Sequence, residues 1–348
     1  MRAAYGRIAD GPFKYQDLRS GVRRALLQRF PYAGRPSGAA GRSPCAFGHN
    51  TTLKATSPVP EEGHPVTEAD TLRRRYAEEF AYTAHLTSPA VTRAFARVPR
   101  ERYLGPGPWR IFQPHARTYW TTPDADPKHL YHDVLVAIDE PRMLNNGQPS
   151  FLAFLIEALG LQEGDHAVHV GCGTGYFTAI LAELVGPTGH VTATEVDADL
   201  AGRSRSNLVD LPHVEVVHAD GGAYDPGPAD AILVNAGATH PRRVWLDSLR
   251  QNGRLLLPLT GPYGSGAVLR VVRRNKGYAA SFVSSITIFP CVGARDADTA
   301  NLLRDAFLGG GGATVRSLRR DLHQSEPTCW LHSDNVCLST VDLAPETG

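Results

Sequence analysis

The chain has 348 residues, with 36 basic and 35 acidic side chains and a formal net charge of +1. This balance predicts no general attraction to nucleic acid or to a membrane surface, and no apolar run is long enough to span a bilayer. The five cysteines lack Cys-x-x-Cys spacing, so we expect neither a disulfide framework nor a metal site, and we expect a reducing, cytoplasmic location.

Residues 1–65 are rich in Arg, Gly and Pro and carry more basic than acidic residues. Such a composition predicts a flexible or poorly ordered N-terminal extension, with a targeting segment or a partner-binding arm as alternatives. Residues 66–150 are expected to form an N-terminal helical part that includes a substrate loop. Helices are predicted over 66–86 and 90–97, and a linker rich in proline and tryptophan follows through Trp120.

A polar cluster precedes the next predicted helix. A short strand or an extended segment is expected over 131–136. The turn cluster Asn145-Asn146-Gly147-Gln148-Pro149-Ser150 stands directly before a helix over 151–159, with Gly160 as its C-cap. This cluster is a candidate for contact with a ligand. Its alternative role is to make a turn and cap the helix.

An apolar run over 168–170 breaks into Gly171, Gly173 and Gly175 and then continues as a helix-patterned segment over 177–185. This pattern predicts a strand, a tight turn and a helix N-terminus, where glycines let backbone N–H groups approach a ligand. A second predicted strand, over 186–194, ends at Glu195, whose carboxylate can accept both hydroxyls of a ribose. The pattern therefore predicts a nucleoside-cofactor pocket, with a ligand-free turn as the alternative.

The spacing of the glycines bears on which nucleoside is bound. Tyr176 and Phe177 stand where dinucleotide-binding turns have their third glycine, which brings the helix close to a pyrophosphate. The absence of that glycine favours a ligand without a pyrophosphate. S-adenosylmethionine fits this requirement.

The remaining elements alternate between strand and helix. Helices are predicted over 198–208 and 241–249, and strands over 213–218, 230–235 and 253–259, with an antiparallel pair over 268–273 and 281–288. We therefore expect an α/β fold with a doubly wound, Rossmann-like sheet, mostly parallel with a C-terminal antiparallel strand pair. The cofactor-binding domain would span 151–295. Residues 296–348 would form a C-terminal extension with a helix over 299–307, four glycines at 309–312 and a strand within 330–340.

With these residues identified, the chain resembles the protein-L-isoaspartate O-methyltransferase family over about 70–290. The resemblance is carried by Val98-Pro99-Arg100-Glu101, Tyr131-x-Asp133, Gln148-Pro149, His169 to Tyr176, Glu195, Asp220-Gly221 and Gly253 to Pro258. It implies an S-adenosylmethionine-dependent methyltransferase. The resemblance implies that Gly171, Gly173 and Gly175 bracket the methionine end of the cofactor, that Glu195 holds the ribose, and that Asp220 and Gly221 lie at the adenine. The predicted cofactor-binding set also includes Cys172, Tyr176, Val196 and Asn235.

Two departures from the family pattern concern the acceptor. Gly147 stands where the family carries a serine that acts on the isoaspartyl substrate, and His169 stands where an acidic residue is usual. We therefore expect a carboxylate of a peptide or small molecule as the acceptor instead of isoaspartyl repair. The candidate catalytic residues are Asn145, Asn146, Gln148 and Ser150, whose amides and hydroxyl could orient that carboxylate.

Other acceptors and functions remain as alternatives. A hydroxyl or amine acceptor would require a base, for which His132, His169, His218 and His240 are candidates, although a core role is favoured for His169. Trp109, Tyr119 and Trp120 could line an acceptor cleft, and a core role is favoured for them too. A nucleic-acid acceptor is unlikely, because only the basic N-terminus supports it. A non-catalytic cofactor-binding or partner-binding protein is a further alternative, and a dehydrogenase is the last.

Overall fold

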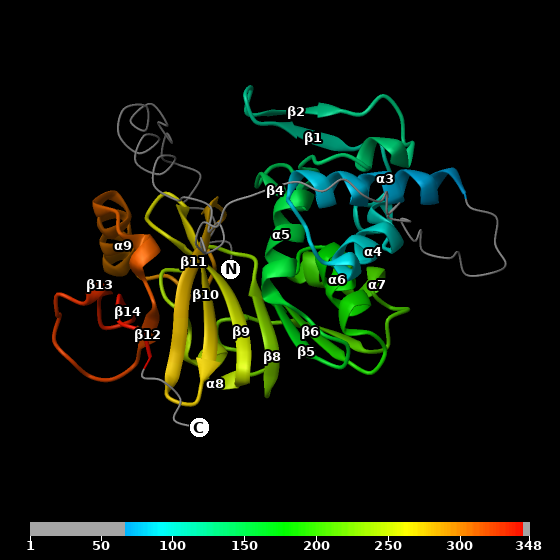
Figure 1. Cartoon of the computed structure of the whole chain (residues 1–348). Helices are drawn as coiled ribbons and strands as arrows, with labels where there is room; N and C mark the ends of the chain where they lie inside the picture. The colour runs from blue at the N-terminus through cyan, green and yellow to red at the C-terminus, as the bar shows by residue number, and fades with distance from the viewer. Residues whose placement is uncertain (1–66, 344–348) are drawn as a thin grey trace, which may run out of the picture.

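The computed structural model describes residues 67–343, so the predicted extension over 1–65 lies outside the described residues. A ten-stranded sheet with helices on both faces organises this part of the chain (Figure 1). Half of the sheet is parallel, in the spatial order β9-β8-β5-β6-β7. These strands are β5 (His166–Val170), β6 (His190–Glu195), β7 (Val214–His218), β8 (Ala229–Val234) and β9 (Leu249–Thr260).

The other half of the sheet is antiparallel and continues from β9 in the order β10-β11-β12-β14-β13. Its strands are β10 (Ser265–Arg274), β11 (Gly277–Thr287), β12 (Ser317–Arg319), β13 (Cys329–His332) and β14 (Cys337–Ser339). The helix α9 (Ala297–Gly309) and the 3-10 turn η4 (Gly312–Thr314) connect β11 to β12. The C-terminal extension is thus built onto β11 at the edge of this sheet.

Alternating side chains of the central strands supply two hydrophobic cores, as expected for a sheet covered on both faces. On β8, Ala231 and Leu233 pack into one core, while Ile232 and Val234 pack into the other. The first core lies under the helices α3 (Glu68–Thr83), α4 (Pro89–Arg97), α5 (Pro149–Leu159) and α6 (Tyr176–Val185), with Leu208 after α7 (Ala198–Asn207). The second lies under α8 (Arg243–Ser248) and α9. The predicted doubly wound α/β fold is confirmed.

The N-terminal part of the described chain sits over the end of the sheet where the strand-to-helix turns lie (Figure 1). It contains α3 and α4, the 3-10 turns η2 (Arg100–Tyr103) and η3 (Pro127–Leu130), and two hairpins. The hairpins are β1 (Arg110–Gln113) with β2 (Thr118–Thr121) and β3 (Ala137–Asp139) with β4 (Leu144–Asn145). The predicted C-cap of α5 is present, because Gly160 adopts a φ of 67°, and the Ser88 hydroxyl caps α4 by accepting from Val91 N.

Four sequence expectations are corrected by the structure. Residues 131–136 form no strand, and the expected linker through Trp120 contains the β1–β2 hairpin. The strand pair over 268–273 and 281–288 does not end the sheet, since three short strands of the extension continue it. The single strand expected within 330–340 is two strands, β13 and β14. Among residues 67–343, no helix is both long and apolar enough to cross a membrane.

Candidate active site

The glycine bend, residues 171–175, joins β5 to α6 and needs its three glycines. Gly171, Gly173 and Gly175 have φ values of 79°, 57° and 95°, a region that residues with a side chain rarely adopt. The N–H groups of Gly171 and Cys172 both donate to Thr194 O, at 2.8 and 3.1 Å, which fastens the bend to the end of β6. At Gly175, a Cβ would lie 2.8 Å from atoms of Leu208 and Ser204. The predicted tight turn is confirmed.

The carboxylate of Glu195 lies against this bend. Its Oε2 accepts a hydrogen bond from Gly173 N at 2.8 Å, and its Oε1 accepts one from Asp197 N at 3.1 Å. Only 7% of the residue is exposed, and this desolvation raises the pKa of Glu195 although the backbone donors oppose the shift. Because an ionised carboxylate offers about four acceptor positions, each oxygen keeps capacity for another donor.

The β3–β4 hairpin covers the bend. A Cβ at Gly173 would lie 3.4 Å from Ile138 Cδ1, at the tip of the hairpin. Arg142 pairs with both Asp139 and Asp197 at 2.6 Å, and Arg203 Nη1 donates to Ile138 O at 3.0 Å. These contacts connect the β3–β4 hairpin to Asp197, two residues after Glu195, and to Arg203 in α7.

The acceptor loop, residues 146–148, follows the hairpin and also lies on the bend. Asn146 is 7% exposed, and its Nδ2 is 3.5 Å from Thr174 Oγ1. Its buried Oδ1 has no hydrogen-bond partner among residues 67–343, which is costly for a polar atom unless a ligand supplies a donor. Gly147 has a φ of 86°, and a Cβ there would lie 3.1 Å from the Phe177 ring. Asn146 is therefore the predicted catalytic candidate that lies beside the bend.

The other three candidates point to other partners. Asp133 accepts hydrogen bonds from Gln148 Nε2 at 2.8 Å, Ser150 Oγ at 2.6 Å and Ser150 N at 2.9 Å, at the beginning of α5. Asn145 accepts from Tyr119 OH at 2.9 Å and donates to Met143 O at 3.0 Å. Gln148 and Ser150 thus stabilise the start of α5 through Asp133, while Asn145 joins β4 to the neighbouring β1–β2 hairpin.

The residues expected at the adenine and acceptor side follow β7 and β8. Asp220 Oδ1 accepts from Gly222 N at 2.8 Å, and its carboxylate occupies the position that a Cβ of Gly293 would need. Gly221 packs directly on Thr194, leaving no room for a side chain. Asn235 N donates to Val170 O at 2.8 Å, which holds Asn235 beside the first glycine of the bend. The loops after β5, β6, β7 and β8 thus meet at one edge, as ligand sites in such sheets require.

Three further members of the predicted cofactor set, Cys172, Tyr176 and Val196, contact other parts of the protein. Cys172 is buried, which raises the pKa of its thiol to about 12, and its Sγ lies 3.6 Å from Ser204 Oγ. Tyr176 is fully buried, with ring centroids 6.2 Å from Phe95 and 5.7 Å from Tyr103. Val196 O accepts from His218 Nε2 at 3.2 Å. Cys172 and Tyr176 therefore can offer a ligand only their backbone atoms.

The histidines considered as bases are placed unfavourably for that role. His169 is fully buried with Nδ1 2.9 Å from Thr178 Oγ1, and burial lowers its pKa to about 4. His240 is buried beside Thr239, and desolvation lowers its pKa, while His218 and His132 are exposed. The favoured core role of His169 is confirmed.

The three aromatic side chains of the N-terminal part divide between core and surface. Trp109 lies in a core with Ile111 and Val136, whereas 40% of Trp120 is exposed. Tyr119 is half-buried and packs against Phe112, with ring centroids 5.2 Å apart. The favoured core role is confirmed for Trp109 and is wrong for Trp120.

This arrangement fits the expected S-adenosylmethionine. The bend offers closely approaching backbone, and Glu195 offers two desolvated acceptor oxygens. Glu195 points toward the bend as the sequence analysis requires, and no bulky side chain separates its carboxylate from Gly173, because the two are hydrogen-bonded.

Two features of the C-terminal part were not anticipated. The expectation of no metal site is at odds with a cluster of His323, Cys329, His332 and Cys337, whose potential ligand atoms all lie within 4.8 Å of one another. A cleft of about 660 Å³ adjoins this cluster and extends to Gly222 and Arg242, near the adenine side. The sequence signal was mixed Cys and His spacing, which a search for paired cysteines overlooks.

The chain is similar to known methyltransferases. Residues 77–296 match the family described as protein-L-isoaspartate(D-aspartate) O-methyltransferase. The protein-L-isoaspartate O-methyltransferase of Ignicoccus hospitalis is 32% identical over 48% of this chain and 82% of its own length, and that of Methylorubrum extorquens is 33% identical over 63% and 86%.

Solved structures resemble the fold. A protein-L-isoaspartate O-methyltransferase structure covers 67% of this chain and 69% of its own, with a TM-score of 0.54 and 21% identity. A Plasmodium falciparum structure, described as a putative enzyme of that name in complex with S-adenosyl-L-homocysteine, covers 63% and 97%, with a TM-score of 0.51 and 19% identity.

Proposed function

The chain belongs to the protein-L-isoaspartate O-methyltransferase family and is an S-adenosylmethionine-dependent methyltransferase, and from this premise we propose that it methylates a carboxylate other than an isoaspartyl one. The acceptor would be a carboxylate of a peptide or small molecule. The proposal concerns the acceptor and the residues that hold it. A cytoplasmic location stays a prediction from the sequence.

The observation that carries the proposal is that the acceptor loop has a glycine, Gly147, at the position where the family carries its serine. Gly147 has a φ of 86° with the Phe177 ring 3.1 Å from its Cβ position, so a serine would be strained there. The Ser150 hydroxyl, three residues further along the chain, already donates to Asp133 at 2.6 Å. Asn146 supplies the polar group of this loop instead, because its Nδ2 can donate to a carboxylate and its buried Oδ1 has no partner among residues 67–343.

A carboxylate acceptor agrees with the residues around the bend. The bound cofactor supplies an electrophilic methyl group on a sulfonium, whose displacement requires alignment and exclusion of water. Glu195 and the closely approaching backbone of the bend would hold the adenosyl and methionine parts. The Asn146 Nδ2 group would donate to the acceptor carboxylate, and its Oδ1 would accept from another group of the acceptor. A carboxylate is already a nucleophile near neutral pH, so this chemistry needs no base. His169, the histidine in the glycine motif, has its pKa lowered to about 4 and is sealed in the core.

The test measures methyl transfer from radiolabelled S-adenosylmethionine to matched peptides. One peptide contains isoaspartate, one contains aspartate, and one carries only its C-terminal carboxylate, while a small dicarboxylic acid completes the set. We expect alkali-labile methyl esters on a non-isoaspartyl acceptor. We expect Asn146→Ala to lower kcat by about tenfold, the effect of one lost hydrogen bond in the transition state, with the affinity for S-adenosylhomocysteine unchanged. Asn301→Ala, on the exposed face of α9, is the matched control.

Each alternative gives a different result in the same assay. Methylation of the isoaspartyl peptide at least about ten times faster than any other acceptor, at every acceptor concentration, would contradict the proposed acceptor. Alkali-stable label on RNA or DNA would favour a nucleic-acid acceptor. Binding of S-adenosylhomocysteine without transfer to any acceptor in a cell extract would favour the non-catalytic alternative. A change in NADH fluorescence on mixing would favour a dehydrogenase.

A further inference from the structure

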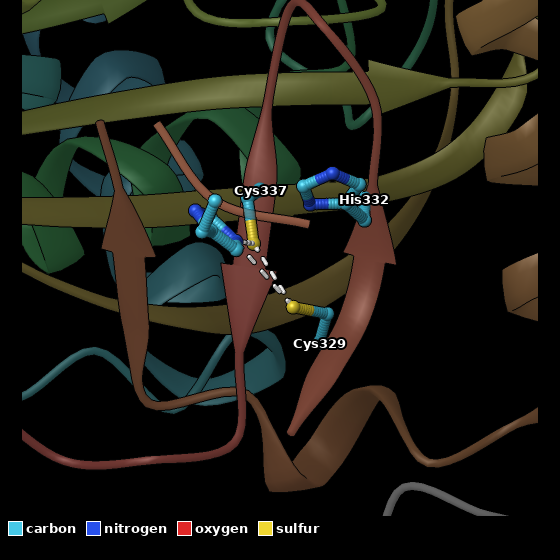
Figure 2. Close-up of side chains that lie close together, drawn as sticks. Cys329, His332 and Cys337 are labelled. Atoms are coloured by element: carbon cyan, nitrogen blue, oxygen red, sulfur yellow. Dashed lines mark hydrogen bonds between the residues drawn. The ribbon is translucent and has the colours of Figure 1, made fainter. Parts of the chain in front are cut away.

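Four side chains of the C-terminal extension converge on one point, which we call the His/Cys cluster: His323, Cys329, His332 and Cys337. Figure 2 shows Cys329 and His332 from one strand facing Cys337 from the next. The two sulfur atoms are 3.5 Å apart, and His323 Nε2 lies 3.2 Å from Cys337 Sγ and 3.6 Å from Cys329 Sγ. The rings of His323 and His332 have centroids 4.7 Å apart.

A bulge in β13 makes this convergence possible. Cys329 and His332 are three residues apart, and in a regular strand their side chains would point to opposite faces. The pairing with β14 shifts register between Cys329 and Leu331, so that Cys329 faces Ser339 and His332 faces Cys337. An extra residue in a bulged strand reverses the alternation. Both side chains therefore reach the same face as Cys337.

The histidines have the environment of metal ligands. His323 Nδ1 lies 2.8 Å from Asp321 O, a contact that fixes the proton on Nδ1 and leaves Nε2 as an acceptor aimed at the two sulfurs. Metal-bound histidines are commonly oriented in this way by a backbone carbonyl. His332 Nδ1 is buried and has no hydrogen-bond partner among residues 67–343. A cation would satisfy the nitrogen lone pairs that face the cluster.

We propose that the His/Cys cluster binds a structural Zn²⁺ ion. Tetrahedral zinc with Zn–S near 2.3 Å and Zn–N near 2.05 Å would separate two sulfurs by about 3.8 Å and a sulfur from a nitrogen by about 3.6 Å. The distances in the cluster, 3.5 Å between sulfurs and 3.2 and 3.6 Å between sulfur and nitrogen, are close to these edges. Two thiolates and two imidazoles favour zinc over magnesium or calcium. With all four positions filled by protein, the site has a structural character and no open position for catalysis.

The position of the ion explains what it would stabilise. The strands β12, β14 and β13 have only three, three and four residues, and β12 pairs with β11 through only Ala279 and Tyr278. Strands of this length need additional interactions to stay ordered. The ion would connect the segment carrying His323 to both β13 and β14, and would thereby shape the cleft that reaches Gly222 and Arg242.

The test is the metal content of the full-length chain, expressed with added zinc and purified under reducing conditions. We expect about one zinc per chain by mass spectrometry, and a content at least about tenfold lower in Cys329→Ser and Cys337→Ser variants. Cys291→Ser is the matched control, because Cys291 is also buried but lies outside the cluster. Removal of zinc from the unmodified chain by a chelator should lower the Tm, and added zinc should restore it.

Cobalt substitution gives an independent readout if the serine variants do not fold. The cobalt-loaded chain should show the intense visible bands of a tetrahedral ion and the near-ultraviolet charge-transfer band of cobalt bound to thiolate. A disulfide between Cys329 and Cys337 in the chain purified under reducing conditions would overturn the proposal. One zinc per chain in the double Cys329→Ser/Cys337→Ser variant would overturn it as well. None of these measurements depends on which acceptor is methylated.

Discussion

Replacement of Glu195 by glutamine tests the cofactor site most directly. The side chain keeps its shape, but one carboxylate oxygen becomes an NH₂ group. In the structure both oxygens already accept from backbone N–H groups, at 2.8 Å from Gly173 and 3.1 Å from Asp197, so the new NH₂ must face one of these donors. The variant therefore loses an acceptor for the ribose as well as the negative charge.

The size of the effect follows from the bonds that are lost. A hydrogen bond to a charged group contributes about 1.5–3 kcal/mol. In Glu195→Gln, one hydrogen bond from the ribose is lost, and the other is made to a neutral oxygen instead of a charged one. We expect Glu195→Gln to weaken cofactor binding by about 2–3 kcal/mol, which corresponds to roughly 30–150-fold in Kd. Because burial raises the pKa of Glu195, ionisation of this group already opposes folding at neutral pH, so the neutral glutamine should change the urea midpoint little.

Calorimetric titration with S-adenosylhomocysteine measures this change. Glu215→Gln is the matched control, since Glu215 is exposed on the neighbouring strand β7. The ionised form of Glu195 is the acceptor, and its fraction decreases as the pH falls through the raised pKa. Cofactor affinity of the unmodified chain should therefore decline at a higher pH than an ordinary glutamate would give, while Glu195→Gln stays insensitive in that range. Equal affinities for Glu195→Gln and Glu215→Gln at neutral pH would refute the reasoning.

Three further variants test the surrounding structure. Arg100 is fully buried and donates to three backbone carbonyls, so Arg100→Met should lower the free energy of unfolding, measured in urea, by about 3–5 kcal/mol. Arg100→Lys should lose less, and a loss below about 1 kcal/mol in Arg100→Met would contradict this prediction. Gly147→Ser should lose about 1–3 kcal/mol in the same assay and gain no isoaspartyl activity, because its φ of 86° strains a serine. Arg142→Ala should raise the cofactor KM roughly fivefold, for about 1 kcal/mol of partly exposed ion pairs, whereas Arg243→Ala on the surface should not.

The sequence was most informative about the parallel half of the sheet. The central strands β5, β6 and β8 are buried on both faces and therefore appear as short apolar runs, such as 230–235, between glycine-marked turns. The extension gave a weaker signal because β12 and β14 have only three residues each, too few for the two-residue alternation of a strand to repeat. Residues 131–136 are rich in apolar and aromatic residues but form no strand, since the Arg100 guanidinium takes up the Leu130, His132 and Val134 carbonyls.

The candidate site was predictable where its chemistry is local in the chain. The glycine bend and Glu195 are identified by residue type and spacing, and the contact between Gly173 N and Glu195 agrees with that interpretation. The roles of Gln148 and Ser150 depend on Asp133, which is separated from them by 15 and 17 residues. The loop sequence contains no information about that partner.

The contacts of Asp197 connect the cofactor side of the site to the acceptor side. Its N–H donates to Glu195 Oε1, and its carboxylate both caps α7 through Leu200 N and pairs with Arg142 in the β3–β4 hairpin. The hairpin continues into Asn146 without an intervening element. A displacement of the hairpin would therefore move the acceptor amide and disturb the support of Glu195 at the same time. Since one salt bridge serves both functions, loss of Arg142 should change the affinities for cofactor and acceptor together, whereas loss of the Asn146 amide should affect the acceptor alone.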